Sequence, residues 1–209
     1  GAATISEAIT LTTTNSNITF GGTVLGVGGA DSDLTINMGT GTVQFVGTVG
    51  AAGTTQVGDI AITGGLNLDA AITLADSLSV TKASNLGASV TTVGTQDFGT
   101  NNADLTTISA DVTLTTTNAN IDMRSIDGAA GTEDLAFNTG SGEITVEGDV
   151  TDIAILTLTD SGGATFNGSV DATTVTITDL DTAGDNVIFN DTLTATTLNV
   201  AAATGNLAY

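Results

Sequence analysis

ITFGGTV, at Ile18–Val24, is the first of five related seven-residue phrases that decide the fold of this 209-residue chain. The others are VQFVGTV at Val43–Val49, ITVEGDV at Ile144–Val150, ATFNGSV at Ala164–Val170 and VIFNDTL at Val187–Leu193. Positions 1, 3 and 7 are apolar, which is the alternation of a strand with one buried face. Position 5 is Gly in four of the five phrases, and Gly there permits a positive φ or a close backbone approach that bends the strand.

Phenylalanine is concentrated at the third position of the phrase. Four of the six Phe residues stand there, namely Phe20, Phe45, Phe166 and Phe189. We therefore predict that these four rings stack as one ladder in the core. We also predict that Gly47, Gly148 and Gly168, all at position 5, occupy one equivalent corner of the fold.

The spacing of the phrases predicts a coiled architecture. Successive phrases start 25 residues apart at Ile18 and Val43, and 20 and then 23 residues apart at Ile144, Ala164 and Val187. A second short apolar strand follows each phrase, such as LTI at Leu34–Ile36. A unit of about 20–25 residues with two or three short strands matches one coil of an all-β solenoid, a parallel β-helix.

A longer period overlies the coils. TLTTTN at Thr10–Asn15 recurs at Thr113–Asn118, and DLTINMGTGTV at Asp33–Val43 recurs as DLAFNTGSGEI at Asp134–Ile144. These offsets of 103 and 101 residues predict an internal repeat of about 100 residues, roughly 10–100 and 113–200, amounting to four or five coils. Neither a helical apolar period nor a linker interrupts the sequence, which predicts one domain over 1–209.

Composition excludes several classes of function. The chain has 23 acidic and 2 basic residues, a net charge of -21, so phosphate backbones and anionic membrane surfaces are unfavourable partners. No apolar run is long enough for a transmembrane helix, and we expect no membrane insertion. Cysteine is absent, so there is no disulfide framework. The chain begins with Gly1 and not Met, which indicates a mature product or an excised segment.

Phrases such as LTTTNSNITFGGTV and DLTINMGTGTVQFVGTVG resemble the repeat regions of filamentous-haemagglutinin-like bacterial surface adhesins and autotransporters. The resemblance covers most of the chain. It implies a right-handed parallel β-helix, an extracellular location on the bacterial cell surface and a role in adhesion or matrix formation.

The acidic turns are the candidate binding residues. Asp179, Asp181 and Asp185 surround a Gly-containing turn, and Asp31 and Asp33 stand in another. Alternate Asp residues offer oxygen ligands to Ca²⁺, although a solvated turn explains both stretches equally well. Calcium is therefore the one cofactor that we consider.

Catalysis is not expected. Solenoid lyases and hydrolases combine acidic clusters with Arg, Lys or His, and this chain has no His and only Lys82 and Arg124. Paired Asp residues alone are uninformative because Asp is so abundant. The Thr-rich runs are too irregular for an ice-binding array, and we expect them at ordinary outward positions.

The sequence thus predicts a structural rod segment of an extracellular adhesin or fibre, whose receptor it does not identify. The alternatives are a self-assembling filament or surface-layer subunit, a Ca²⁺-dependent binding module, and a solenoid carbohydrate-active enzyme. No charged side chain follows Asp191. Because isolated solenoids normally carry polar caps, we expect each end to meet either another coil of a longer chain or another copy.

Overall fold

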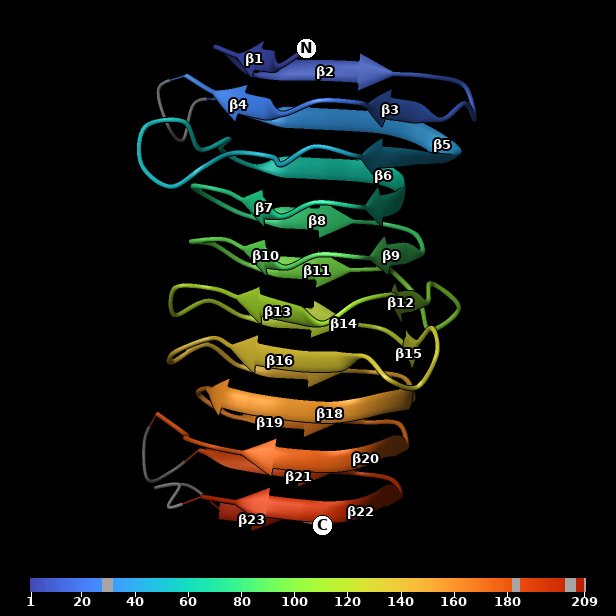
Figure 1. Ribbon diagram of the computed structural model, residues 1–209, viewed down its shortest axis with the longest axis vertical. Helices are drawn as coiled ribbons and strands as arrows, with labels where there is room; N and C mark the ends of the chain where they lie inside the picture. The colour runs from blue at the N-terminus through green and yellow to red at the C-terminus, as the bar shows by residue number, and fades with distance from the viewer. Residues whose placement is uncertain (28–31, 182–184, 202–205, 209) are drawn as a thin grey trace.

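The computed structural model describes residues 1–27, 32–181, 185–201 and 206–208. In this part of the chain there are strands and turns but no helix, and thus no helix of a length and apolarity suited to crossing a membrane. Short strands follow one another around a coil, and the coils stack along one axis between the two termini (Figure 1). The strand pairs are parallel and join each coil to the next. The chain is a β-solenoid.

Each coil has three sides, which we call A, B and C in chain order. Side A contains β1 (Ala3–Ile5), β4 (Val24–Gly26), β7 (Ile72–Thr73), β10 (Val90–Thr91), β13 (Val112–Thr115), β16 (Asp134–Asn138) and the later parts of β18 (Val150–Asp160), β20 (Val170–Ile177) and β22 (Leu193–Val200). Side B contains β2 (Ile9–Thr12), the early parts of β5 (Leu34–Phe45) and β6 (Ile60–Leu68), and β8 (Leu78–Val80), β11 (Gln96–Phe98), β14 (Ile121–Met123), β17 (Ile144–Val146), β19 (Ala164–Phe166), β21 (Asn186–Phe189) and β23 (Asn206–Ala208). Side C contains β3 (Ile18–Phe20), β9 (Ser84–Leu86), β12 (Thr106–Ile108), β15 (Ile126–Gly128) and the remaining parts of β5, β6, β18, β20 and β22.

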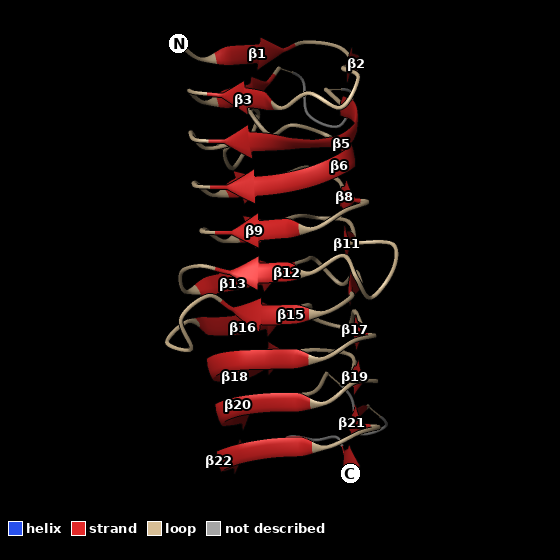
Figure 2. Ribbon diagram, turned by 90° about the vertical axis from the view of Figure 1, so that its right-hand side faces the viewer, coloured by secondary structure: helices blue, strands red, loops and turns tan. Residues whose placement is uncertain are grey.

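The coil is right-handed. In both Figure 1 and Figure 2, the strands nearest the viewer run leftward as the chain descends from the N-terminus to the C-terminus. This is the usual hand of a connection between parallel strands. The long strands β5, β6, β18, β20 and β22 bend around a corner and so take part in two sides.

Inward side chains form continuous columns. On side A, register pairs connect Ala3, Val24, Val49, Ile72, Val90, Leu114, Phe137, Leu158, Ile177 and Val200. The steps range from 18 residues, between Ile72 and Val90, to 25 residues, between Val24 and Val49. The predicted coil length is thus correct at its upper limit and slightly too long at its lower limit.

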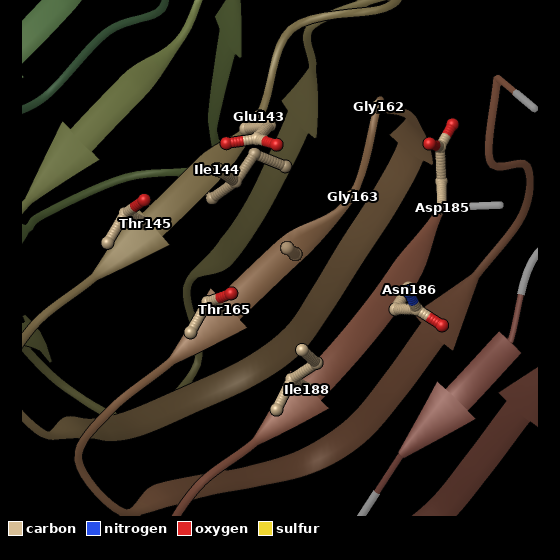
Figure 3. Close-up of a pocket in the computed structure, with 10 residues that line it drawn as sticks. Glu143, Ile144, Thr145, Gly162, Gly163, Thr165, Asp185, Asn186 and Ile188 are labelled. Atoms are coloured by element: carbon tan, nitrogen blue, oxygen red, sulfur yellow. The ribbon is translucent and has the colours of Figure 1, made fainter.

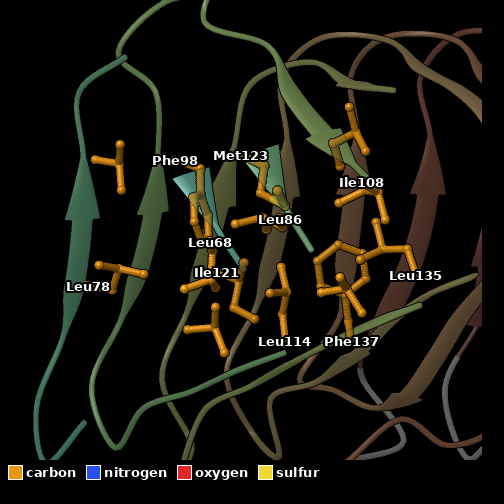
Figure 4. Close-up of a cluster of buried hydrophobic side chains, with 14 of the residues drawn as sticks. Leu68, Leu78, Leu86, Phe98, Ile108, Leu114, Ile121, Met123, Leu135 and Phe137 are labelled. Atoms are coloured by element: carbon orange, nitrogen blue, oxygen red, sulfur yellow. The ribbon is translucent and has the colours of Figure 1, made fainter. Parts of the chain in front are cut away.

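Strand alternation explains the core. In β14 and β17 the outer two residues are buried and the middle one is partly exposed, so one apolar face of each strand points inward. Leu, Ile, Met and Phe side chains from the middle coils fill the interior without a visible division (Figure 4). A strand of three residues buries little surface alone, and its stability therefore depends on the neighbouring coils.

The five phrases do not lie above one another, and the predicted single Phe ladder is wrong. Phe20 stacks on Phe45 on side C, with centroids 5.0 Å apart. Phe166 stacks on Phe189 on side B, with centroids 5.1 Å apart. The rings form two pairs in different columns because one phrase, a strand followed by a tight corner, fits two corners of the coil.

The predicted common corner for the glycines is wrong for the same reason. Gly47 follows side C and lies against Gly22, whereas Gly168 follows side B and lies against Gly148. A Cβ on Gly47 would lie 2.5 Å from the carbonyl carbon of Gly22. The fifth position therefore requires Gly because the preceding coil approaches closely, and Gly47, Gly148 and Gly168 do not have the left-handed φ that would also favour Gly.

The long repeat preserves a local corner while changing its place in the coil. Asn15 and Asn118, at the same point of the two TLTTTN copies, both have φ of 57°. The first copy leads from side B to side C, and the second leads from side A to side B. The offset is thus one side short of five coils and not a whole number of coils.

Candidate functional site

The acidic turn predicted to bind calcium begins at the end of β20. Asp179 and Asp181 are exposed and flank Leu180, which is buried. The Asp179 carboxylate accepts the N–H of Leu180 at 2.9 Å, and Asp185 lies beyond residues that the structure does not describe. Among the described residues, which include all three aspartates, no group of three or more His, Cys, Asp or Glu is arranged to hold a metal. Calcium binding stays a prediction.

Asp185 lines a shallow depression on side B, near the corner between sides A and B (Figure 3). The depression encloses about 470 Å³ and is open to solvent. Its lining residues come from three successive coils: Glu143, Ile144, Thr145, Gly162, Gly163, Ala164, Thr165, Asp185, Asn186 and Ile188. Asp179 and Asp181 are not among them, so the structure places only one of the three predicted ligands here.

The chemistry of this depression is modest. Glu143 and Asp185 lie on either side of the Gly162–Gly163 stretch, and the hydroxyl groups of Thr145 and Thr165 face the same hollow (Figure 3). The absence of side chains on the two glycines creates the hollow. Carboxylates and hydroxyl groups of this kind accept hydrogen bonds from polyols or hydrated cations.

Other acidic residues connect the coils at their corners. Asp33 Oδ1 accepts the N–H of Asp59 at 2.9 Å, and Asp59 Oδ1 accepts the N–H of Ser77 in the next coil at 2.8 Å. Ser77 Oγ in turn accepts the N–H of Thr95 at 3.1 Å. Asp33 therefore satisfies a backbone donor at a corner, where strand pairing ends. Asp31, named with it as a candidate, lies outside the described residues.

The two TLTTTN copies build the same corner bond. Asn15 Oδ1 accepts the N–H of Thr40 at 3.0 Å, and Asn118 Oδ1 accepts the N–H of Ser141 at 3.1 Å. Each Asn takes the left-handed conformation that Asn tolerates better than most residues. Sequence reasoning detected the repetition but not its role, although an Asn after a Thr run is a readable turn signal.

Two buried carboxylates hold loops in place. Asp104 Oδ2 accepts the N–H groups of Thr100 and Asn101 at 3.0 and 3.1 Å. Burial opposes ionisation, but these hydrogen bonds and nearby Lys82 prevail, and the pKa of Asp104 is lowered. Glu133 Oε2 similarly accepts the N–H of Ala130 at 3.0 Å, and this bond lowers the pKa of Glu133.

The second basic residue lies beside a pair of like charges. Asp97 and Asp122 are register partners on the outward face of side B. Burial raises the pKa of Asp97, with Asp122 adding to the effect and Arg124 opposing it. Asp97 Oδ1 is buried and has no hydrogen-bond partner among the described residues. This pair is a local electrostatic strain that Arg124 partly relieves.

Buried polar groups also occur inside the coil, and the sequence reasoning missed them. Gln96 is fully buried in the inward column of side B, and its Nε2 donates to the carbonyl of Thr115 at 2.9 Å. Thr92 Oγ1 donates to the carbonyl of Gly94, and Thr139 Oγ1 donates to that of Gly142, both at 2.6 Å. These bonds satisfy turn carbonyls within the protein, a structural role.

Neither a protein-family model, a curated protein nor a solved structure matches this chain. The structure therefore establishes the β-solenoid architecture, whereas the adhesin resemblance rests on the sequence phrases alone.

Proposed function

We propose that this chain is a structural segment of an extracellular bacterial adhesin or fibre, in which it acts as a stiff rod mediating adhesion or matrix formation. The observation that carries the proposal is the unbroken inward column from Ala3 to Val200 on side A. At roughly 4.8 Å per coil, this column extends over about 45 Å. The fold converts chain length directly into reach.

Two kinds of contact make such a rod stiff. Parallel strand pairing joins the coils on all three sides, and side-chain oxygens at the corners accept N–H groups from the following coil. Bending the rod would have to stretch hydrogen bonds and separate packed side chains on one side of the core. These contacts support a mechanical role better than a role that requires a moving site.

The outer surface supports an extracellular setting. Thr, Asn and Asp occupy most outward positions, and the net charge of -21 favours solubility and discourages rods from associating side by side. The stability of the fold relies on no disulfide, because the chain has no Cys. The resemblance of the phrases to adhesin repeat regions agrees with this setting.

The test uses the organism that carries the gene. An antibody against the purified chain should label intact cells, and a strain that lacks the gene should attach less well to surfaces and to neighbouring cells. Labelling that appears only after the cells are permeabilised would contradict the extracellular location. Normal attachment of the deletion strain would contradict the adhesive role.

A further inference from the structure

The two ends of the solenoid expose strand edges. In the first coil, β1 pairs only with β4, and β2 and β3 pair only with β5. In the last coil, β22 pairs only with β20, and β23 pairs only with β21. The outer edges of these five strands have no neighbour in the described part of the chain, and such edges readily pair with another strand.

The end coils also expose residues that belong to the core. Ile9 in the first coil is 38% exposed, and Leu198 and Val200 in the last coil are 43% and 49% exposed. Their register partners one coil inward, Leu34, Val175 and Ile177, are buried. Both end faces are therefore open cross-sections of the core.

Charge does not protect either face. Glu7 is the only charged side chain among residues 1–20, and residues 192–201 contain none. By contrast, the flanks carry most of the acidic residues of the chain. An apolar face without a charged rim has little to oppose its burial against a matching face.

The two faces match each other in size. Phe20 occupies the second inward position of side C in the first coil, and Ala195 occupies the corresponding position in the last coil. On side A the order is reversed, because Ala3 begins the column that Val200 ends. When the last coil of one copy meets the first coil of another, a large side chain lies over a small one on each of these sides.

We propose that the C-terminal face of this chain stacks on the N-terminal face of a second copy, head to tail. The contact continues the three parallel sheets across the junction and propagates into a filament, because a heterologous contact leaves both outer ends free. A head-to-head contact would instead require antiparallel pairing, which no strand pair of the described chain adopts. The inference rests on the geometry of the coils and not on the proposed surface location.

The experiment places a charge on each face separately. Ile9→Lys charges the N-terminal face, and Leu198→Lys charges the C-terminal face. As a matched control, Val93→Lys charges an apolar residue on the flank that is 48% exposed. Circular dichroism first establishes that each variant has the β-sheet spectrum of the parent chain, and a variant that does not is replaced by Val200→Lys or Leu11→Lys on the same face.

Sedimentation velocity and electron microscopy then measure assembly. The parent chain and Val93→Lys should form end-to-end rods that lengthen with salt, because salt screens the repulsion between acidic copies. Ile9→Lys and Leu198→Lys should each remain at the 20.5 kDa monomer mass, and a mixture of the two should form a species of about twice that mass.

The mixture is decisive because Ile9→Lys keeps an intact C-terminal face and Leu198→Lys keeps an intact N-terminal face. A dimer of either variant alone would establish a head-to-head or tail-to-tail contact and overturn the proposal. A parent chain that stays monomeric at all salt concentrations would also overturn it, and would assign the end faces to neighbouring coils of a longer polypeptide. A reduction of assembly by Val93→Lys would indicate lateral association instead.

Discussion

Replacement of Gly168 by Ala tests how the coils approach one another at a corner. A Cβ on Gly168 would lie 2.5 Å from the carbonyl oxygen of Gly148 and 2.7 Å from the backbone nitrogen of Asp149. Both atoms belong to the backbone of the preceding coil, so no flexible side chain can move aside. The two coils would have to separate locally.

The expected cost follows from this overlap. Hydrogen bonds on both sides of the corner hold the coils together, from the N–H of Asn167 to the carbonyl of Val146 and from the N–H of Val150 to the carbonyl of Ser169, each 2.8 Å long. Overpacking of this kind costs about 1–3 kcal/mol. The reduced freedom of the unfolded chain returns about 0.4–1 kcal/mol when Gly becomes Ala. We therefore expect Gly168→Ala to lower the free energy of unfolding by about 1–2 kcal/mol.

Urea denaturation followed by circular dichroism measures this change. Gly21→Ala is the matched control, because a Cβ at Gly21 meets no atom within 4 Å and its φ is not left-handed. The control should be neutral or stabilising by up to about 1 kcal/mol. Equal unfolding free energies for the two variants would refute the close approach of the coils at this corner.

Three further predictions concern the core, the charged surface and the acidic turn. Phe166→Ala should lower the free energy of unfolding by about 3–5 kcal/mol, because the ring is fully buried and stacked; a loss below about 0.5 kcal/mol would place it on the surface. Asp97→Asn should raise the urea midpoint at pH 7, because burial raises the pKa of Asp97 and its charge therefore opposes folding. That gain should fade as the pH falls toward the usual Asp range, where the parent chain also loses the charge, and a gain independent of pH would contradict the electrostatic cause. Asp179, Asp181 and Asp185 form no metal-holding group within the described residues, so the melting temperature should be equal in chelator and in millimolar calcium, whereas a rise with calcium would establish the turn as a site.

The local conformation of the coil could be read from the sequence. Alternation in Ile144–Val146 and Ala164–Phe166 predicted strands with two inward residues, and the structure has these strands. The Gly after each strand predicted a bend, and Gly148 and Gly168 do lie against each other at one corner. These features follow from a few neighbouring residues, so the pattern contains the information.

The side on which a phrase lies could not be read in the same way. ITFGGTV and ITVEGDV are alike in pattern, yet Ile18 begins β3 on side C and Ile144 begins β17 on side B. Both corners make a similar change of direction, so the phrase itself does not distinguish them. The choice depends on the accumulated length of all the preceding loops, and those vary from coil to coil.

The acidic and amide residues show a second limit. Asp33, Asn15 and Asn118 each accept a backbone N–H from a coil that lies 23 to 26 residues further along the chain. No local pattern reveals such a partner. A carboxylate in a turn therefore reads as a candidate ligand until the stacking of the coils is known.

Cross-linking of introduced cysteines tests most directly the central claim, that successive coils stack in register with equivalent phrases on two different sides. The chain has no native Cys, so Thr19→Cys/Gln44→Cys on side C and Thr145→Cys/Thr165→Cys on side B can each be examined alone. Both pairs are register partners in adjacent coils, and a short thiol-specific cross-linker should join each within one molecule. The pair Gln44→Cys/Thr145→Cys, which a single ladder of phrases would place in succession, should stay unjoined. Cross-linking of that third pair within one molecule, or failure of the first two, would contradict the stacked three-sided coil.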